Sequence, residues 1–240
     1  MSGHSKWATT HRQKEAADAK KGAVFTKLAN LITVAAREGG GDSETNFKLR
    51  LATDKARAAN MPKDNIERTI KKGTGAGKEG ANFEEITYEI IGPAGSGFIV
   101  EAITDNRNRT AGEIKAIINK NNITLGSANS VAWNFDRQGV ITILSKNLNK
   151  DAELALIDAG AIDIEQAEDT WLIITAPGNL MTVAEKIKTL NYIVKEATLA
   201  YLPKEELKIS NPEDQEKVER LYNLLDDLDD VTNVFTNASW

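Results

Sequence analysis

The stretch from Val140 to Leu202 constrains the fold most strongly, because its apolar pattern changes in a fixed order along the chain. Short β-branched runs and period-two alternation predict strands, whereas apolar residues three and four apart predict helices. The predicted helices include 154–159 and 183–190, and the predicted strands are 140–144, 162–167, 171–176 and 195–202. This β-α-β-β-α-β order is typical of a ferredoxin-like fold.

The residues before this stretch predict half of a second sheet. Alternation over 83–90 and the apolar run 98–104, joined by the turn sequence GPAGSG, predict a β-hairpin. A helix follows, and Thr110 with Glu113 three residues later predicts a capping box at its start. Alternating apolar residues over 131–135 predict one more strand.

The residues after it supply the missing elements of that sheet. An apolar stripe predicts a helix over 212–228, and a last strand is predicted over 231–236. We therefore predict that one α/β domain is inserted into the other. The discontinuous domain covers 80–136 plus 204–240, and the inserted ferredoxin-like domain covers 137–203.

The N-terminal third predicts a helical bundle over 1–79. A stripe of apolar residues indicates a helix from near Gly22, and three consecutive glycines after residue 38 end it. A second helix is predicted over 44–59. A third is predicted with Pro62 at its first position, where a missing N–H is tolerated. The predicted fold class is α+β, with a helical bundle followed by two ferredoxin-like α/β domains.

Charge is distributed unevenly between the two parts of the chain. Residues 1–80 hold 16 Lys and Arg against 9 Asp and Glu, a net charge of +7. Residues 81–240 hold 14 against 26, a net charge of −12, which together give the −5 of the whole chain. A basic module on an acidic body favours a nucleic-acid partner, although drift can also produce such asymmetry.

The basic N-terminal arm contains most of the candidate nucleic-acid contacts. They are His4, Lys6, Trp7, Arg12, Lys14, Lys20, Lys21 and Lys27. Trp7 lies among cations, so it could stack on a base, or it could anchor the arm on the bundle. In a helix, Lys14 and Lys21 would share one side, as would Lys20 and Lys27. Each pair would form a basic strip along a nucleic-acid strand or a solvated lysine-rich face.

The sequence predicts neither a metal site nor a catalytic set. His4 and His11 are the only histidines, and the chain has no cysteine, so a zinc site lacks ligands. Contact with phosphate or a base, or a packing role, remains open for both histidines. No nucleophile with an adjacent base is recognisable, which disfavours an enzyme with a site between the α/β domains.

The run Asp105–Thr110 places two arginines between a predicted strand and a predicted helix. Arg107 and Arg109 could form an anion site, because a helix N-terminus favours negative charge. The alternative is a structural turn in which Asp105 pairs with one arginine.

Four aspartates between Asp226 and Asp230 lie at the end of the last predicted helix, where carboxylates oppose the helix dipole. A calcium loop starting at Asp226 is excluded, because it would lack glycine at position six and glutamate at position twelve.

Several long blocks resemble the YebC/PmpR family. They are GHSKW, KKGAVFTKLANLITVAAREGG, NMPKDNIERTIKKG, TDNRNRTAGEI and DDVTNVF. The resemblance implies an N-terminal helical bundle and two α/β domains, one interrupting the other. It maps family blocks onto Gly3–Trp7, Lys27, Arg37 and Asp105–Thr110. This chain departs from the family pattern at Ile90-Ile91 and at Asn129, which leaves the edge of the predicted hairpin in question.

The resemblance also implies a function. Family members are described as cytoplasmic transcriptional regulators that bind DNA, whereas mitochondrial relatives act as translational activators and bacterial members are linked to stalled ribosomes. We therefore expect a cytoplasmic, monomeric regulator that binds DNA. The alternative is a translation factor that acts on the ribosome, its RNA or mRNA. We expect no cofactor, no metal and no small-molecule substrate. We also expect no membrane partner, since no apolar run approaches the roughly 20 residues that span a bilayer.

Overall fold

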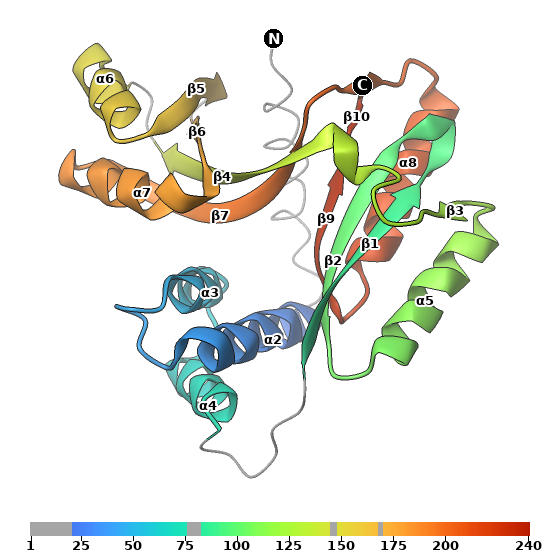
Figure 1. The fold of residues 1–240 in the computed structure, drawn as a ribbon, viewed down its shortest axis with the longest axis horizontal. Coiled ribbons are helices and arrows are strands. Elements are labelled where there is room, and N and C mark those ends of the chain that lie inside the picture. The colour runs from blue at the N-terminus through green and yellow to red at the C-terminus, as the bar shows by residue number, and fades with distance from the viewer. Residues whose placement is uncertain (1–20, 76–82, 145–147, 168–169) are drawn as a thin grey trace. The chain divides into compact units, whose positions relative to one another are not determined.

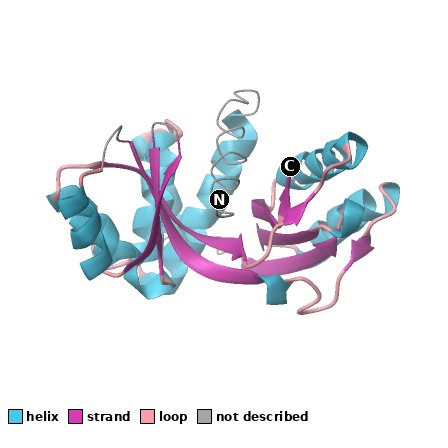
Figure 2. Ribbon diagram, turned by 90° about the horizontal axis from the view of Figure 1, so that it is seen from above, coloured by secondary structure: helices cyan, strands magenta, loops and turns pink. Residues whose placement is uncertain are grey.

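The computed structural model describes residues 21–75, 83–144, 148–167 and 170–240. The described chain is a mixed α+β structure with two four-stranded antiparallel sheets, drawn by element in Figure 1 and by helix and strand in Figure 2. It divides into two compact units. One is Asn134–Glu206, and the other contains the described residues up to Trp133 together with Leu207–Trp240. In the described ranges no helix has the length and apolar character needed to cross a bilayer.

Three helices form the N-terminal part of the larger unit, α2 (Lys21–Gly39), α3 (Phe47–Ala58) and α4 (Lys63–Gly73). Their apolar faces meet in one core, which includes Leu28, Ile32, Leu49, Ala56 and Ile66. The predicted second helix begins three residues later than expected, because Asn46 caps it. Its side chain accepts from Leu49 N and donates to the carbonyls of Ala35 and Gly40. Pro62 is the N-cap of α4, one position before the predicted one.

The sheet of the larger unit has the order β3-β1-β2-β9. The four strands are β1 (Glu84–Ile91), β2 (Gly97–Thr104), β3 (Thr124–Leu125) and β9 (Val231–Thr236). Two helices accompany them, α5 (Arg107–Lys120) and α8 (Pro212–Asp226). Phe98 and Val100 of β2 pack against Ile114 of α5 and Leu221 of α8. Two short strands, β8 (Leu207–Lys208) and β10 (Ala238–Ser239), form a separate parallel pair that the sequence did not predict.

The helical part is attached to this sheet by specific contacts. Val34 of α2 clusters with Phe83 and Ile103. The Arg37 guanidinium donates from Nη2 to the carbonyl oxygen of Phe83, and the Lys72 ammonium lies 5.5 Å from the centroid of the Phe83 ring. A cation over an aromatic face is attractive, so Phe83 is held by two basic residues as well as by apolar packing.

The strand predicted over 131–135 is wrong. Ala132–Asn134 forms a 3-10 helix, and only Phe135 belongs to a strand. The preceding loop is organised by Glu89, whose carboxylate accepts from the backbone N–H of Asn129, Val131 and Ala132 at 2.6–2.8 Å. Burial alone would raise the pKa of Glu89, but these hydrogen bonds outweigh it and lower the pKa.

The unit Asn134–Glu206 has the predicted β-α-β-β-α-β order. Its elements are β4 (Phe135–Leu144), α6 (Lys150–Asp158), β5 (Ala161–Ala167), β6 (Thr170–Thr175), α7 (Leu180–Thr189) and β7 (Ile193–Pro203). The strands are antiparallel in the order β5-β6-β4-β7. Leu156 of α6 and Ile187 of α7 are fully buried. The three predicted domain boundaries stay predictions.

Candidate nucleic-acid interface

Most of the predicted arm contacts lie outside the described residues. They are His4, Lys6, Trp7, Arg12, Lys14 and Lys20. Lys21 begins α2, and its side chain is not described. Lys27 is half-buried, and its ammonium donates to the carbonyl oxygen of Asp226 at the last turn of α8. A cation at a helix C-terminus stabilises the dipole, so Lys27 has a structural role in the described chain.

The two predicted arginines of the Asp105–Thr110 run lie in the first turn of α5. This helix begins at Arg107 and is capped by Asn106, whose side chain accepts from Arg109 N at 3.1 Å. The capping box predicted at Thr110 is therefore wrong, because the helix starts one turn earlier. Thr104, the last residue of β2, accepts from Asn106 N at 2.9 Å and so joins the strand end to the cap.

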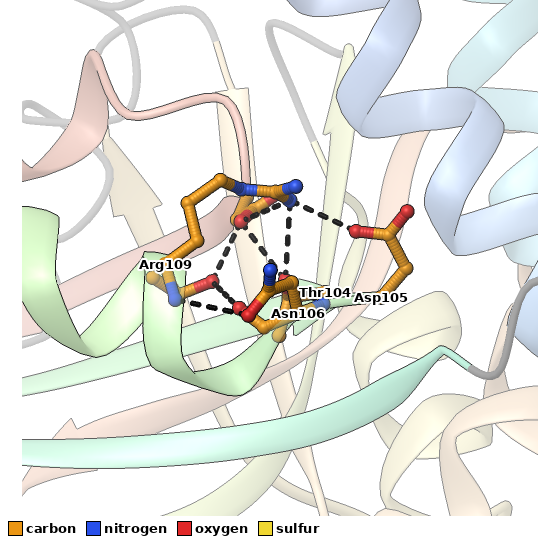
Figure 3. A network of polar contacts seen from close by, with 6 residues as sticks. Thr104, Asp105, Asn106 and Arg109 are labelled. Carbon is orange, nitrogen blue, oxygen red and sulfur yellow. Dashed lines mark hydrogen bonds and ion pairs between the residues drawn. The ribbon is translucent and has the colours of Figure 1, made fainter.

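A buried carboxylate from the far end of the chain completes this turn. Asp230, whose side chain is 8% exposed, accepts from Arg109 Nη2 through both oxygens, at 2.9 and 2.8 Å. It also accepts from the hydroxyls of Thr104 at 3.0 Å and Thr110 at 2.6 Å. Figure 3 shows this network of polar contacts around Arg109. Asp230 lies four residues after the end of α8 and directly before β9, so this aspartate does not oppose the dipole of α8 and instead accepts hydrogen bonds from α5.

The network determines the charge state of Asp230. Burial by itself raises the pKa of this carboxyl, but the hydrogen bonds from Thr110, Arg109 and Thr104 act in the opposite direction and the pKa is lowered. Arg109 also donates to Asp105 Oδ1 at 3.0 Å. The structural alternative, an arginine paired with Asp105, is therefore confirmed for Arg109.

The geometry nevertheless leaves basic groups exposed at this helix N-terminus. In the described chain every side-chain contact of Arg109 goes through Nη2, so Nε and Nη1 face no internal acceptor. Arg107 is exposed, and no described residue forms an ion pair or hydrogen bond with its guanidinium. Its charge acts on Tyr88, where burial raises the pKa of the phenol and Arg107 only partly offsets this rise.

Helix α4 presents a second group of cations that sequence reasoning did not single out. Arg68, Lys71 and Lys72 follow at spacings of three and four residues, which places them on one side of the helix, and all three are exposed. Arg68 and Lys71 have no ion pair with any described residue. The spacing alone could have identified this basic face.

Comparisons with models of known protein families identify the family of this chain. The family model for the TACO1/YebC N-terminal domain matches residues 5–76, and the model for the TACO1/YebC second and third domain matches residues 83–238. The chain belongs to the TACO1/YebC family, which confirms the resemblance drawn from its sequence.

Individual relatives match along the whole chain. A protein of Caldanaerobacter subterraneus is 51% identical over 240 residues, covering 99% of this chain and 98% of the relative. A Thermotoga maritima protein is 49% identical, covering 99% and 93%. Both are named "Probable transcriptional regulatory protein". The crystal structure of a conserved hypothetical protein from Aquifex aeolicus superposes with a TM-score of 0.83 at 39% identity, covering 92% of this chain and 91% of that one.

Proposed function

We propose that this protein is a regulator of gene expression that binds DNA, acting as a cytoplasmic monomer. The names of its relatives support a regulator. The observation that carries the nucleic-acid proposal is the first turn of α5, where Arg107 is exposed and Arg109, although fixed by Asp230, keeps a side chain that is 45% exposed.

This turn suits a phosphate group for three reasons. The N–H groups of Arg107 and Asn108 lie in the first turn, where no intrahelical acceptor exists for them. The helix dipole favours an anion at the same place. Finally, Arg109 is already held in one conformation, so phosphate binding would order fewer rotamers of its side chain. Such contacts position a protein on the backbone and read no sequence.

The other contacts would come from the arm and the helical bundle. We assign the arm contacts to His4, Lys6, Trp7, Arg12, Lys14, Lys20 and Lys21, and add Lys27 as a contact beside its structural role. The exposed cations of α4 extend the basic surface. Residues 21–75 alone hold eleven Lys and Arg against six Asp and Glu. Phosphate contacts of this kind make affinity fall steeply with salt concentration.

A second candidate is a translation factor that binds the ribosome or mRNA. The observation that favours it is the uneven charge. Long naked duplex DNA would repel the net charge of −12 over residues 81–240, whereas the basic N-terminal arm could reach into ribosomal RNA. Crosslinking in cells, followed by sequencing of the bound nucleic acid, separates the two candidates. Promoter DNA among the products supports the DNA proposal, whereas ribosomal RNA without DNA refutes it.

The α5 turn is tested by fluorescence anisotropy with labelled duplex DNA and single-stranded RNA. We expect Arg107→Ala to weaken binding by about 5- to 10-fold and to reduce the slope of log K against log salt by about one. Lys115→Ala is the matched control, because Lys115 is an exposed cation further along the same helix, beyond its first turn. Equal effects of the two substitutions would show that only general charge matters.

The arm is tested separately. Replacing Lys6, Arg12, Lys14, Lys20 and Lys21 together with glutamine should abolish binding and leave the thermal unfolding midpoint unchanged. If this variant still binds with the affinity of the unsubstituted protein, the arm is not a contact surface.

A further inference from the structure

Helix α6 exposes apolar side chains that its own sheet does not cover. Its inner side is formed by Ala152 and Leu156, both buried. Leu154 and Ile157, three residues apart on another side, remain 60% and 54% exposed. Residues at this spacing are neighbours on a helix surface, so the two side chains form one outward apolar strip. A surface helix that packs only on its own sheet typically carries polar or charged residues on the side opposite its buried stripe.

Another exposed apolar side chain follows on the next strand. The chain turns at Gly160, which has a φ of +107° and donates from its N–H to the Ile157 carbonyl at 2.9 Å. Ile162 follows in β5 and is 62% exposed. Helix α6 packs beside β5, as Figure 1 shows. We call Leu154, Ile157 and Ile162 the α6–β5 patch. Scattered exposed apolar residues need no explanation, but three on adjoining elements indicate an interaction surface.

The surroundings of the patch are acidic. Residues 150–167 hold five carboxylates and one lysine. Asp151, Asp158 and Asp163 are exposed, and each lies within three residues of one of the three apolar residues in the sequence. An apolar centre with a charged rim is the usual anatomy of a protein-binding surface, and the sign of the rim selects the partner.

The carboxylates and the register of β5 determine which kind of partner can bind the α6–β5 patch. A second copy of this chain, docked symmetrically, would place the same carboxylates opposite one another, which is unfavourable. Strand addition at the free edge of β5 is hindered, because the pairing register shifts between Ala161 and Asp163, next to Ile162. A bulge of this kind interrupts the ladder that an added strand would need.

We infer that the α6–β5 patch binds a basic amphipathic helix of a protein partner, with the apolar side of that helix on Leu154, Ile157 and Ile162 and its lysines or arginines near the acidic rim. This mode of recognition uses anchors three and four residues apart in the ligand. The patch belongs to the Asn134–Glu206 unit, whereas Arg107 and Arg109 of the proposed phosphate contact belong to the other unit.

The test uses the full chain and a fluorescein-labelled amphipathic peptide of about 16 residues, long enough to form a helix, with leucines on one side and lysines on the other. We expect saturable binding in the micromolar range, and loss of about tenfold in affinity for Leu154→Ser and for Ile162→Ser. Ile193→Ser is the matched control. Ile193 is 67% exposed in β7, the opposite edge strand of the same sheet, and its substitution should leave affinity unchanged.

Three results would overturn the inference. The first is a peptide of the same pattern with glutamates in place of lysines that binds as tightly as the basic one. The second is equal binding by the Leu154→Ser, Ile162→Ser and Ile193→Ser variants. The third is concentration-dependent dimerisation that Leu154→Ser abolishes, because it would identify a second copy as the occupant. Unchanged circular dichroism spectra and melting curves establish that each variant is folded.

Discussion

Removal of the Asp230 carboxylate is the most informative perturbation of the α5 turn. Asp230→Ala leaves three donors without their acceptor, the Arg109 guanidinium and the hydroxyls of Thr104 and Thr110. A hydrogen bond to a charged group contributes about 1.5–3 kcal/mol to stability. The sum is smaller than three such terms, because Arg109 is 45% exposed and keeps Asp105. Thr110 also retains the Asn106 carbonyl at 3.3 Å. We expect the free energy of unfolding to fall by about 2–4 kcal/mol.

The same substitution has a pH signature whose sign follows from the lowered pKa of Asp230. An unfolded aspartate titrates near about 3.9, and the folded carboxyl titrates below that value. Its stabilisation is therefore complete above the unfolded pKa and is lost as the pH falls through the folded pKa. The difference in stability between the wild type and Asp230→Ala should stay constant from about pH 7 to pH 5 and shrink below about pH 4.

Urea unfolding followed by circular dichroism measures both effects. Asp229→Asn serves as the control, because Asp229 is the exposed neighbour of Asp230, and its substitution should change stability by less than about 0.5 kcal/mol. A loss for Asp230→Ala no larger than that of the control, or a difference that persists unchanged to pH 3, would refute the reasoning.

Two further substitutions test other parts of the larger unit. Glu89→Gln should lower the free energy of unfolding by about 1–3 kcal/mol at neutral pH, because three backbone N–H groups lose a charged acceptor. This loss should shrink in acid, since the pKa of Glu89 is lowered, and an unchanged difference at pH 3 in urea titrations would contradict it. Gly73→Ala should destabilise by about 1–3 kcal/mol, because the added methyl would lie 2.5 Å from the Thr33 carbonyl oxygen. Gly112→Ala, a helical glycine with open space around it, should raise the melting temperature, and equal melting shifts for the two glycine variants would contradict the packing described.

Elements with a strong local pattern were predictable from the sequence. The strand predicted over 231–236 has the bounds of β9, and the order of elements between β4 and β7 was correct. In these segments the apolar period coincides with the side that becomes buried, as with Val218, Leu221 and Leu225 on α8. Local information was sufficient there because tertiary packing reinforced it.

Contacts between distant parts of the chain were not predictable. Thr110 has the sequence context of an N-cap, but its hydroxyl donates to a carboxylate 120 residues away, and the nearby Asn106 caps the helix instead. The apolar alternation over 131–135, which predicted a strand, was also misread because a contact between distant residues determines the backbone there. Val131 and Phe135 are buried while Trp133 is 59% exposed, so the pattern reports burial correctly although the backbone there is a loop and a 3-10 helix held by Glu89.

The pairing of β2 with β9 has a consequence for synthesis of the chain. Phe98 pairs with Thr236, so the sheet acquires β9 only after the long stretch of chain between β2 and β9 has been synthesised. At about 5–20 residues per second, the roughly 130 residues between the two strands take on the order of 6–25 s to add. During that interval β2 has an open edge and Arg109 has no Asp230. A nascent chain released before Val231 would therefore carry an unfinished sheet, however well its earlier helices had formed.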